Sequence, residues 1–181
     1  MEKVEVLEVP KKEKSKKNWF KELLPYIIIV VVVVLLRTFI ITPIQVDGSS
    51  MYPTLEDKEL LILKKYDKSF DRFDIVVFDY NGSRLIKRVI GLPGERVEYK
   101  DNKLYIDGKQ IKEDFDRSSK TKDFKLDDIG IDIIPEGYYF VMGDNRDNST
   151  DSRIIGLVSE KDIKGSTNLS IFPFDKIGTI N

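Results

Sequence analysis

The feature that most constrains this chain is an apolar run near its N-terminus. Residues 23–36 contain no charged side chain, and their centre is a block of isoleucine and valine from Ile27 to Val34. With the apolar residues on either side, the run reaches the length of a membrane span, about 20 residues. So many β-branched residues also suit a buried strand, but strands usually run for only about 4–8 residues. No A-x-A-like cleavage site follows, so we expect a permanent transmembrane helix at residues 19–41 rather than a signal peptide that is removed.

Lysines crowd the segment before the apolar run, with six of them from Lys11 to Lys21. Segments rich in lysine and arginine stay on the cytoplasmic side of a membrane. We therefore expect residues 1–18 to form a disordered basic tail in the cytoplasm, and the chain beyond the span to lie outside it. The net charge of the whole chain is −1, which gives no general attraction to nucleic acid.

Beyond the apolar run the sequence has the pattern of β structure. Pro43 ends any continuing helix, and short apolar segments of strand length follow it. Asn81-Gly82 is a strong signal for a two-residue hairpin turn. Asp101-Asn102 and Asp107-Gly108 mark further turns between alternating segments. The pattern therefore predicts antiparallel strands joined by tight turns.

The β region divides into a larger and a smaller part. Short alternating segments predict a small inserted lobe at residues 95–137, within which the polar stretch 112–128 indicates a mobile loop. Residues 42–94 and 138–181 carry the longer apolar segments and are expected to form the core. We therefore expect a mainly β fold preceded by one N-terminal helix.

The sequence contains no histidine and no cysteine. Covalent catalysis by this chain would therefore need a serine or threonine hydroxyl, a lysine amine or a carboxylate. A general base would have to be lysine, aspartate, glutamate or tyrosine. The absence of cysteine also means that an exported part has no disulfides, which suits a bacterial cell surface.

Lys87 lies in an apolar segment that we expect to be a strand. Alternate residues of a strand share a face, so Lys87 lies beside Leu85 and Val89. An ammonium on an apolar face loses its hydration, which favours the neutral amine, a usable base. The ordinary alternative is a lysine at a sheet edge whose head reaches water.

Ser50 lies in the segment from Gly48 to Leu55. Gly48 permits a close approach of a substrate to the backbone, and Pro53 stiffens the turn. Backbone N–H groups around such a serine could stabilise an oxyanion. Ser49 offers an equally good hydroxyl, and chemistry alone does not separate the two.

The segment from Gly143 to Arg153 is the densest polar stretch of the chain. A calcium loop is one interpretation, but the glycine and glutamate that an EF-hand requires are replaced by Ser152 and Val158. The interpretation that we favour is a buried hydrogen-bond network, in which Asp151 pairs with Arg153 and hydroxyl groups orient a base.

Together these stretches resemble the type I signal peptidases, the bacterial leader peptidases. The match covers four segments in the family's order, residues 37–55, 73–78, 86–94 and 143–153. The resemblance implies that Ser50 is the nucleophile and Lys87 its general base. It also implies that Ser149 hydrogen-bonds and orients the lysine, within a structural network of Asp144, Asp151 and Arg153.

The resemblance further implies a signal-peptidase-type catalytic β core that removes signal peptides from exported preproteins at small-x-small sites. Some members hold the oxyanion with a serine two residues before the nucleophile; here that residue is Gly48, which leaves the Ser50 N–H. The short lobe and single anchor resemble the Gram-positive branch and imply a single-pass protein of the bacterial cell membrane. Expected partners are preproteins, membrane lipid and the export machinery, without cofactor, metal or nucleic acid. The implied substrate-binding positions are Ile44, Val46, Gly48, Val77, Leu85 and Ile86.

Two other classes of protein fit part of the sequence. A non-catalytic, membrane-tethered β module that binds peptides would share the anchor and the strands, but its Ser50 and Lys87 would lie far apart. A self-cleaving Ser/Lys regulator has a related catalytic fold, but it carries a DNA-binding helical domain where this chain has its apolar run. The distance between Lys87 and Ser50 separates the enzyme from the binding module.

Overall fold

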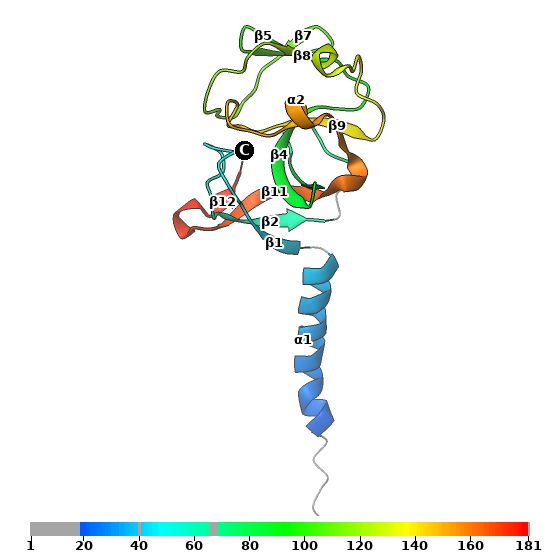
Figure 1. Cartoon of the computed structure of the whole chain (residues 1–181). Helices are drawn as coiled ribbons and strands as arrows, with labels where there is room; N and C mark the ends of the chain where they lie inside the picture. The colour runs from blue at the N-terminus through cyan, green and yellow to red at the C-terminus, as the bar shows by residue number, and fades with distance from the viewer. Residues whose placement is uncertain (1–18, 40, 66–68, 181) are drawn as a thin grey trace, which may run out of the picture. The chain divides into compact units, whose positions relative to one another are not determined.

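The structure is a computed structural model, and it describes residues 19–39, 41–65 and 69–180 (Figure 1). The chain divides into two compact units, Met1–Leu35 and Leu36–Asn181. The tail predicted at residues 1–18 lies outside the described residues.

Most of helix α1 (Trp19–Phe39) belongs to the first unit. Its large apolar side chains from Leu23 to Leu35 are exposed, as Val30 is to 61%. Among the helices of the described residues, none combines the length and the hydropathy required of a membrane span. The transmembrane helix expected at residues 19–41 therefore stays a prediction.

The second unit is built on an eight-stranded antiparallel sheet (Figure 1). Seven strands follow the order β1-β2-β11-β3-β4-β9-β10, and β12 pairs with β11. The strands are β1 (Ile41–Gln45), β2 (Leu60–Lys64), β3 (Ile75–Tyr80), β4 (Ser83–Gly91), β9 (Tyr138–Met142), β10 (Val158–Ser159), β11 (Ile163–Phe172) and β12 (Gly178–Thr179). Short helices α2 (Ser152–Ile155), η2 (Glu160–Asp162) and η3 (Phe174–Lys176) lie between the later strands.

Strands β3 and β4 form the hairpin that the Asn81-Gly82 pair predicts. Tyr80 pairs with Ser83 across the turn, and Asn81 and Gly82 have φ angles of 48° and 76°. Two successive positive φ angles are the geometry of the type I′ turn, which matches the twist of the strands on either side. The turn therefore fixes the register that places Lys87 opposite Val76.

A second, four-stranded sheet lies at the end of the unit away from β1 and β2 (Figure 1). Its order is β7-β6-β5-β8, and its turns fall at Asp101-Asn102 and Asp107-Gly108, as expected. The elements are β5 (Val97–Lys100), β6 (Lys103–Ile106), β7 (Lys109–Ile111), β8 (Phe124–Lys125) and the 3-10 helix η1 (Leu126–Ile129). The mainly β fold is thus confirmed. Residues 36–181 form one compact unit, so the boundaries of a lobe at 95–137 and of a core at 42–94 and 138–181 stay predictions.

Strand β4 lies in the middle of the packed region. Its residues from Ile86 to Gly91 are all buried, because apolar clusters cover both of its faces. One cluster packs Ile86 with Ile44 and Val77, and another packs Val89 with Val76 and Val141. A long polar side chain in this stretch of β4 is therefore largely removed from water.

Candidate active site

Lys87 and Ser50 meet in the structure. The Lys87 Nζ lies 2.7 Å from the Ser50 Oγ and donates a second hydrogen bond to the Ile86 carbonyl oxygen at 2.8 Å. Lys87 is only 1% exposed, so the alternative of an edge lysine reaching into water is wrong. A non-catalytic module was expected to hold these two residues apart, and the contact contradicts that expectation.

The surroundings of Lys87 favour its neutral form. Burial lowers the pKa of Lys87 from 10.5 to about 8, although the negative charges of Asp151 and Asp144 act in the opposite direction. Removal from water penalises the charged ammonium more than the two carboxylates stabilise it. About a tenth of the amine is therefore neutral at pH 7 and able to accept a proton, far more than for a lysine with the ordinary pKa of 10.5.

Ser50 is positioned by the polar loop from Gly143 to Arg153. The Ser50 carbonyl accepts a hydrogen bond from the Asn145 N–H at 3.0 Å, and the Asn145 side chain donates to the Ser49 carbonyl at 3.0 Å. The Ser49 hydroxyl accepts from the Asn148 side chain at 3.2 Å. Of the two neighbouring serines, Ser50 is therefore the one whose hydroxyl contacts Lys87.

Gly143 allows this loop to approach the turn around Ser50. A methyl group at this position would collide with the Ser50 carbonyl oxygen and with the Ser149 Oγ. The backbone carbonyl cannot move without moving Ser50 itself. Glycine is thus required by close approach rather than by its φ angle.

Gly143→Ala is expected to lower kcat by about 100-fold, because displacing a reacting group by about 1 Å costs a factor of this size. The added methyl group should also destabilise the fold by about 1–3 kcal/mol, as overpacking usually does. Steady-state kinetics and denaturant unfolding of the full chain measure both effects. A variant with wild-type kcat would show that the loop is free to withdraw from Ser50.

Ser149 lies against Gly143, but not in the contact that the resemblance implied. Its buried Oγ has no hydrogen-bond partner among the residues that the structure describes. Lys87 donates instead to the Ile86 carbonyl, the acceptor next to it in its own strand. The role of Ser149 in orienting the base stays a prediction.

Asp151 and Arg153 form a bidentate ion pair. The Arg153 Nε and Nη2 donate to the two carboxylate oxygens of Asp151, each at 2.8 Å. Asp151 also caps α2 by accepting the Arg153 N–H, and it accepts the Gly143 N–H at 3.0 Å. The pair therefore fixes both ends of the polar loop.

Asp144 belongs to a separate ion pair that the sequence did not reveal. Its partner is Arg88, at 2.7 Å, and both side chains are buried. Thr54, four residues after Ser50, donates its hydroxyl to the same carboxylate at 2.6 Å. Arg88 follows Lys87 in β4 on the opposite face, so the two cations are divided between the two sides of one strand. The signal was present, because a charged residue inside a buried strand requires a partner.

Arg146 is the centre of a second buried network that the sequence did not reveal. It donates to Glu113 at 2.6 Å, to the Tyr99 hydroxyl at 3.0 Å and to the Thr121 hydroxyl at 2.6 Å. Glu113 and Thr121 are buried, and they come from the stretch 112–128 that was expected to be a mobile loop. That expectation is wrong in so far as these side chains tie the stretch to the polar loop.

A cavity of about 410 Å³ opens beside the Ser50–Lys87 contact, between β1 and β4. Ile44, Val46, Leu85 and Ile86 line it, together with Ser50 and Lys87. Val77 does not line it, because this residue is completely buried behind its cross-strand partner Ile86. Gly48 is also absent from the lining; its N–H donates to Asp57 at 2.8 Å. Within residues 19–39, 41–65 and 69–180, no acidic side chains gather in a group that could hold a metal ion.

Comparison with known proteins gives a consistent result. Residues 16–172 match the family described as signal peptidase, peptidase S26. Signal peptidase I S of Bacillus subtilis (strain 168) is 42% identical over 180 residues, covering 94% of this chain and 96% of that protein. A signal peptidase I of Bacillus amyloliquefaciens is 45% identical over 176 residues, covering 91% of each. The crystal structure of a signal peptidase I from Enterococcus faecalis V583 is 42% identical, with a TM-score of 0.50, and covers 54% of this chain and 96% of that one.

A buried lysine amine in contact with a serine hydroxyl is an arrangement that suits the nucleophile and base of a serine peptidase. The chain belongs to the signal peptidase family, peptidase S26. Within that family it is a type I signal peptidase of the Gram-positive kind, which confirms the resemblance inferred from the four segments.

Proposed function

We propose that the chain removes N-terminal signal peptides from exported preproteins as a membrane-anchored serine endopeptidase with a Ser50–Lys87 dyad. The observation that carries the proposal is the 2.7 Å contact between the Ser50 Oγ and the buried Lys87 Nζ. Family membership supports the reaction, and the lowered pKa of Lys87 supports its role as the base.

The proposed reaction passes through an acyl-enzyme. Neutral Lys87 takes the proton of the Ser50 hydroxyl while the oxygen attacks the carbonyl carbon of the peptide bond. The Ser50 N–H, which has no other acceptor within the described part of the chain, donates to the oxyanion. Protonated Lys87 then gives its proton to the leaving amine of the substrate. Lys87, now neutral again, activates the water that hydrolyses the ester.

Two strand edges face the cavity and support binding of an extended substrate. β1 pairs with β2 alone, and β4 pairs with β9 only from Arg88 onward. Backbone groups of a peptide could therefore add to these edges, as in other cases of strand addition. The apolar side chains of Ile44, Val46, Leu85 and Ile86 would then select small residues before the cleaved bond. Val77 would support the cavity wall by packing behind Ile86, and Gly48 would contribute to substrate binding from the turn before Ser50.

The finer assignments complete the proposal. Ser149 would orient Lys87 through a shift of its free hydroxyl, and Asp144, Asp151 and Arg153 would hold the loop. Residues 19–41 would anchor the chain, supported by the exposed apolar side chains of α1. The basic tail would stay in the cytoplasm and the catalytic β core, with its lobe at 95–137, on the outer face, beside lipid and the export machinery.

The direct test is incubation of the full chain in detergent with a preprotein that carries an Ala-x-Ala site. Mass spectrometry should find the new N-terminus directly after the second alanine. A matched preprotein with leucine in place of that alanine should be cleaved at least about tenfold more slowly, if the apolar walls of the cavity select a small side chain there as proposed. Equal cleavage of both, or cleavage elsewhere, would contradict the proposed specificity.

The pH dependence tests the state of the base. Since the pKa of Lys87 lies at about 8 and the reaction needs the neutral amine, kcat/KM should rise about tenfold per pH unit below 8 and level off above it. Stopped or continuous peptide-cleavage assays between about pH 6 and 10 give the profile. A rise that continues to the ordinary lysine value of 10.5 would mean that Lys87 is not desolvated in the working enzyme.

A further inference from the structure

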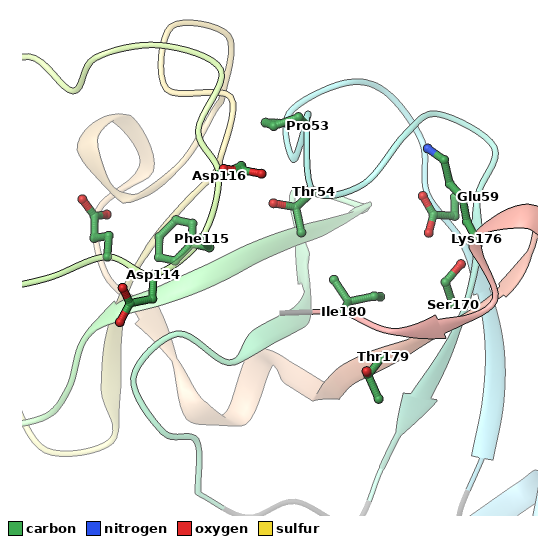
Figure 2. A pocket seen from close by; sticks show the side chains of 11 residues that line it. Pro53, Thr54, Glu59, Asp114, Phe115, Asp116, Ser170, Lys176, Thr179 and Ile180 are labelled. Atoms are coloured by element: carbon green, nitrogen blue, oxygen red, sulfur yellow. The ribbon is translucent and has the colours of Figure 1, made fainter.

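A second cavity borders the turn that carries Ser50. It has a volume of about 570 Å³, and Pro53 and Thr54 form one of its walls (Figure 2). The cavity between β1 and β4 is lined by Ser50 and Met51 of the same turn. The segment from Ser50 to Thr54 is therefore shared by both cavities.

Carboxylates dominate the charged lining of this second cavity. The charged residues are Glu59, Glu113, Asp114, Asp116 and Lys176. Three of them are already paired: Glu113 with Arg146 and Arg117, Asp114 with Lys112, and Lys176 with Glu56. The negative charge that remains available comes from Glu59 and Asp116.

Neither of these two carboxylates has an ion-pair partner among the described residues. Asp116 is exposed at the cavity wall beside Phe115 (Figure 2). Glu59 is only 3% exposed, and its carboxylate accepts a single hydrogen bond, from the Glu56 N–H at 3.0 Å. Lys176, which pairs with Glu56, also interacts electrostatically with Glu59, so the buried charge of Glu59 is compensated only in part.

An unsatisfied hydroxyl group points independently to a polar occupant. Ser170 of β11 lies on the same wall as Glu59 (Figure 2), is 1% exposed, and its Oγ has no hydrogen-bond partner in the described chain. Thr167 of the same strand is in the same state and lines an adjoining cavity of about 220 Å³. Buried hydroxyl groups are normally hydrogen-bonded, so two unpaired ones beside a cavity indicate a missing partner.

We propose that this acidic cavity binds the ammonium or guanidinium groups of lysine or arginine in the substrate segment that follows the cleaved bond. The inference rests on the proposed function and deepens it. If the residues before the bond occupy the cavity between β1 and β4, the residues after it leave along the Ser50–Thr54 turn. Pro53 is three residues from Ser50, at most about 11 Å away, which about three extended substrate residues can span. The cations would therefore come from about the third to fifth position after the bond.

The binding test uses the product segment and does not depend on catalysis. A fluorescent peptide with lysines at the third to fifth positions is compared with a matched glutamine peptide, by anisotropy, on the Ser50→Ala full chain. We expect the lysine peptide to bind about three- to tenfold more tightly at 50 mM salt, and less so at 500 mM, where charges are screened. Equal affinity of the two peptides overturns the proposal.

Variants of the cavity give the second measurement. Asp116→Asn changes an exposed side chain and should fold normally; with Glu59→Gln added, the preference for lysine should fall toward one. Asp162→Asn, an exposed carboxylate outside the cavity, should keep the preference. A preference for lysine that survives in the double variant overturns the proposal. Binding of spermidine by a chain that binds the two peptides equally also overturns it, because the cavity would then be a site for free amines and not for the substrate.

Cleavage assays separate this inference from the function on which it rests. Matched substrates with lysine or glutamine after the bond should differ in kcat/KM by the same factor as the peptides differ in affinity. If neither is cleaved while the peptides still differ, the peptidase proposal fails and the cation site stands. If both are cleaved equally and bind equally, only the cation site fails.

Discussion

Lys87→Ala is expected to lower kcat for preprotein cleavage by about 10⁴-fold or more, with the fold retained. The expectation follows from the 2.7 Å contact, because no other basic side chain contacts the Ser50 hydroxyl in the described chain. Groups that act as one catalytic unit lose about 10⁴–10⁶-fold when a member is removed. Single-turnover cleavage of an Ala-x-Ala preprotein by the full chain measures the loss, and circular dichroism checks the fold.

The matching serine variants complete this experiment. Ser50→Ala should lose as much activity as Lys87→Ala, and the double variant should lose no more than either alone, because the two act together. Ser49→Ala is the control, since its hydroxyl contacts Asn148 and not Lys87; a change of a few-fold at most is expected. Retained activity in Ser50→Ala with loss in Ser49→Ala would move the nucleophile to the neighbouring residue.

Asp144→Asn is expected to destabilise the chain by about 3–5 kcal/mol. Removing one member of a buried ion pair leaves the other charged and without compensation, and here that member is Arg88. Urea unfolding of the full chain in detergent, followed by circular dichroism of the backbone, measures the loss in the free energy of unfolding.

A double-mutant cycle isolates the ion pair from its surroundings. Arg88→Met together with Asp144→Leu should cost less than the sum of the single variants, since no unpaired charge remains. The exposed pair of Arg96 and Asp132 is the control, and Asp132→Asn there should leave the unfolding midpoint unchanged. Additive losses in the cycle would mean that Arg88 and Asp144 are held independently.

Local chemistry explains what the sequence predicted well. The turns at Asn81-Gly82 and Asp107-Gly108 depend only on positive φ angles of adjacent residues, so each can be predicted from two residues of the sequence. For Lys87 the apolar strand allowed either burial or an edge position with its head in water, and the structure shows burial. Its contact with Ser50, by contrast, was implied by the family resemblance and not by any local pattern.

Non-local pairing explains what the sequence did not predict. The partners Arg88 and Asp144 are 56 residues apart, and Arg146 and Glu113 are 33 apart. Polar stretches such as 112–128 look alike whether they face water or a buried guanidinium. The position of β11 between β2 and β3 could not be predicted either, because the sequence of residues 163–172 does not indicate which strands they pair with.

That position of β11 determines when the catalytic sheet can assemble during synthesis. A ribosome delivers the chain from its N-terminus, so β2, β3 and β4 are made while the strand that joins β2 to β3 is still missing. The serine and the lysine are both present by residue 87, yet the sheet beneath them stays in two halves until residue 172 has emerged. A nascent or truncated chain that lacks β11 therefore holds the serine and the lysine without the strand that joins the two halves of their sheet, and we expect no proteolysis before β11 has been made.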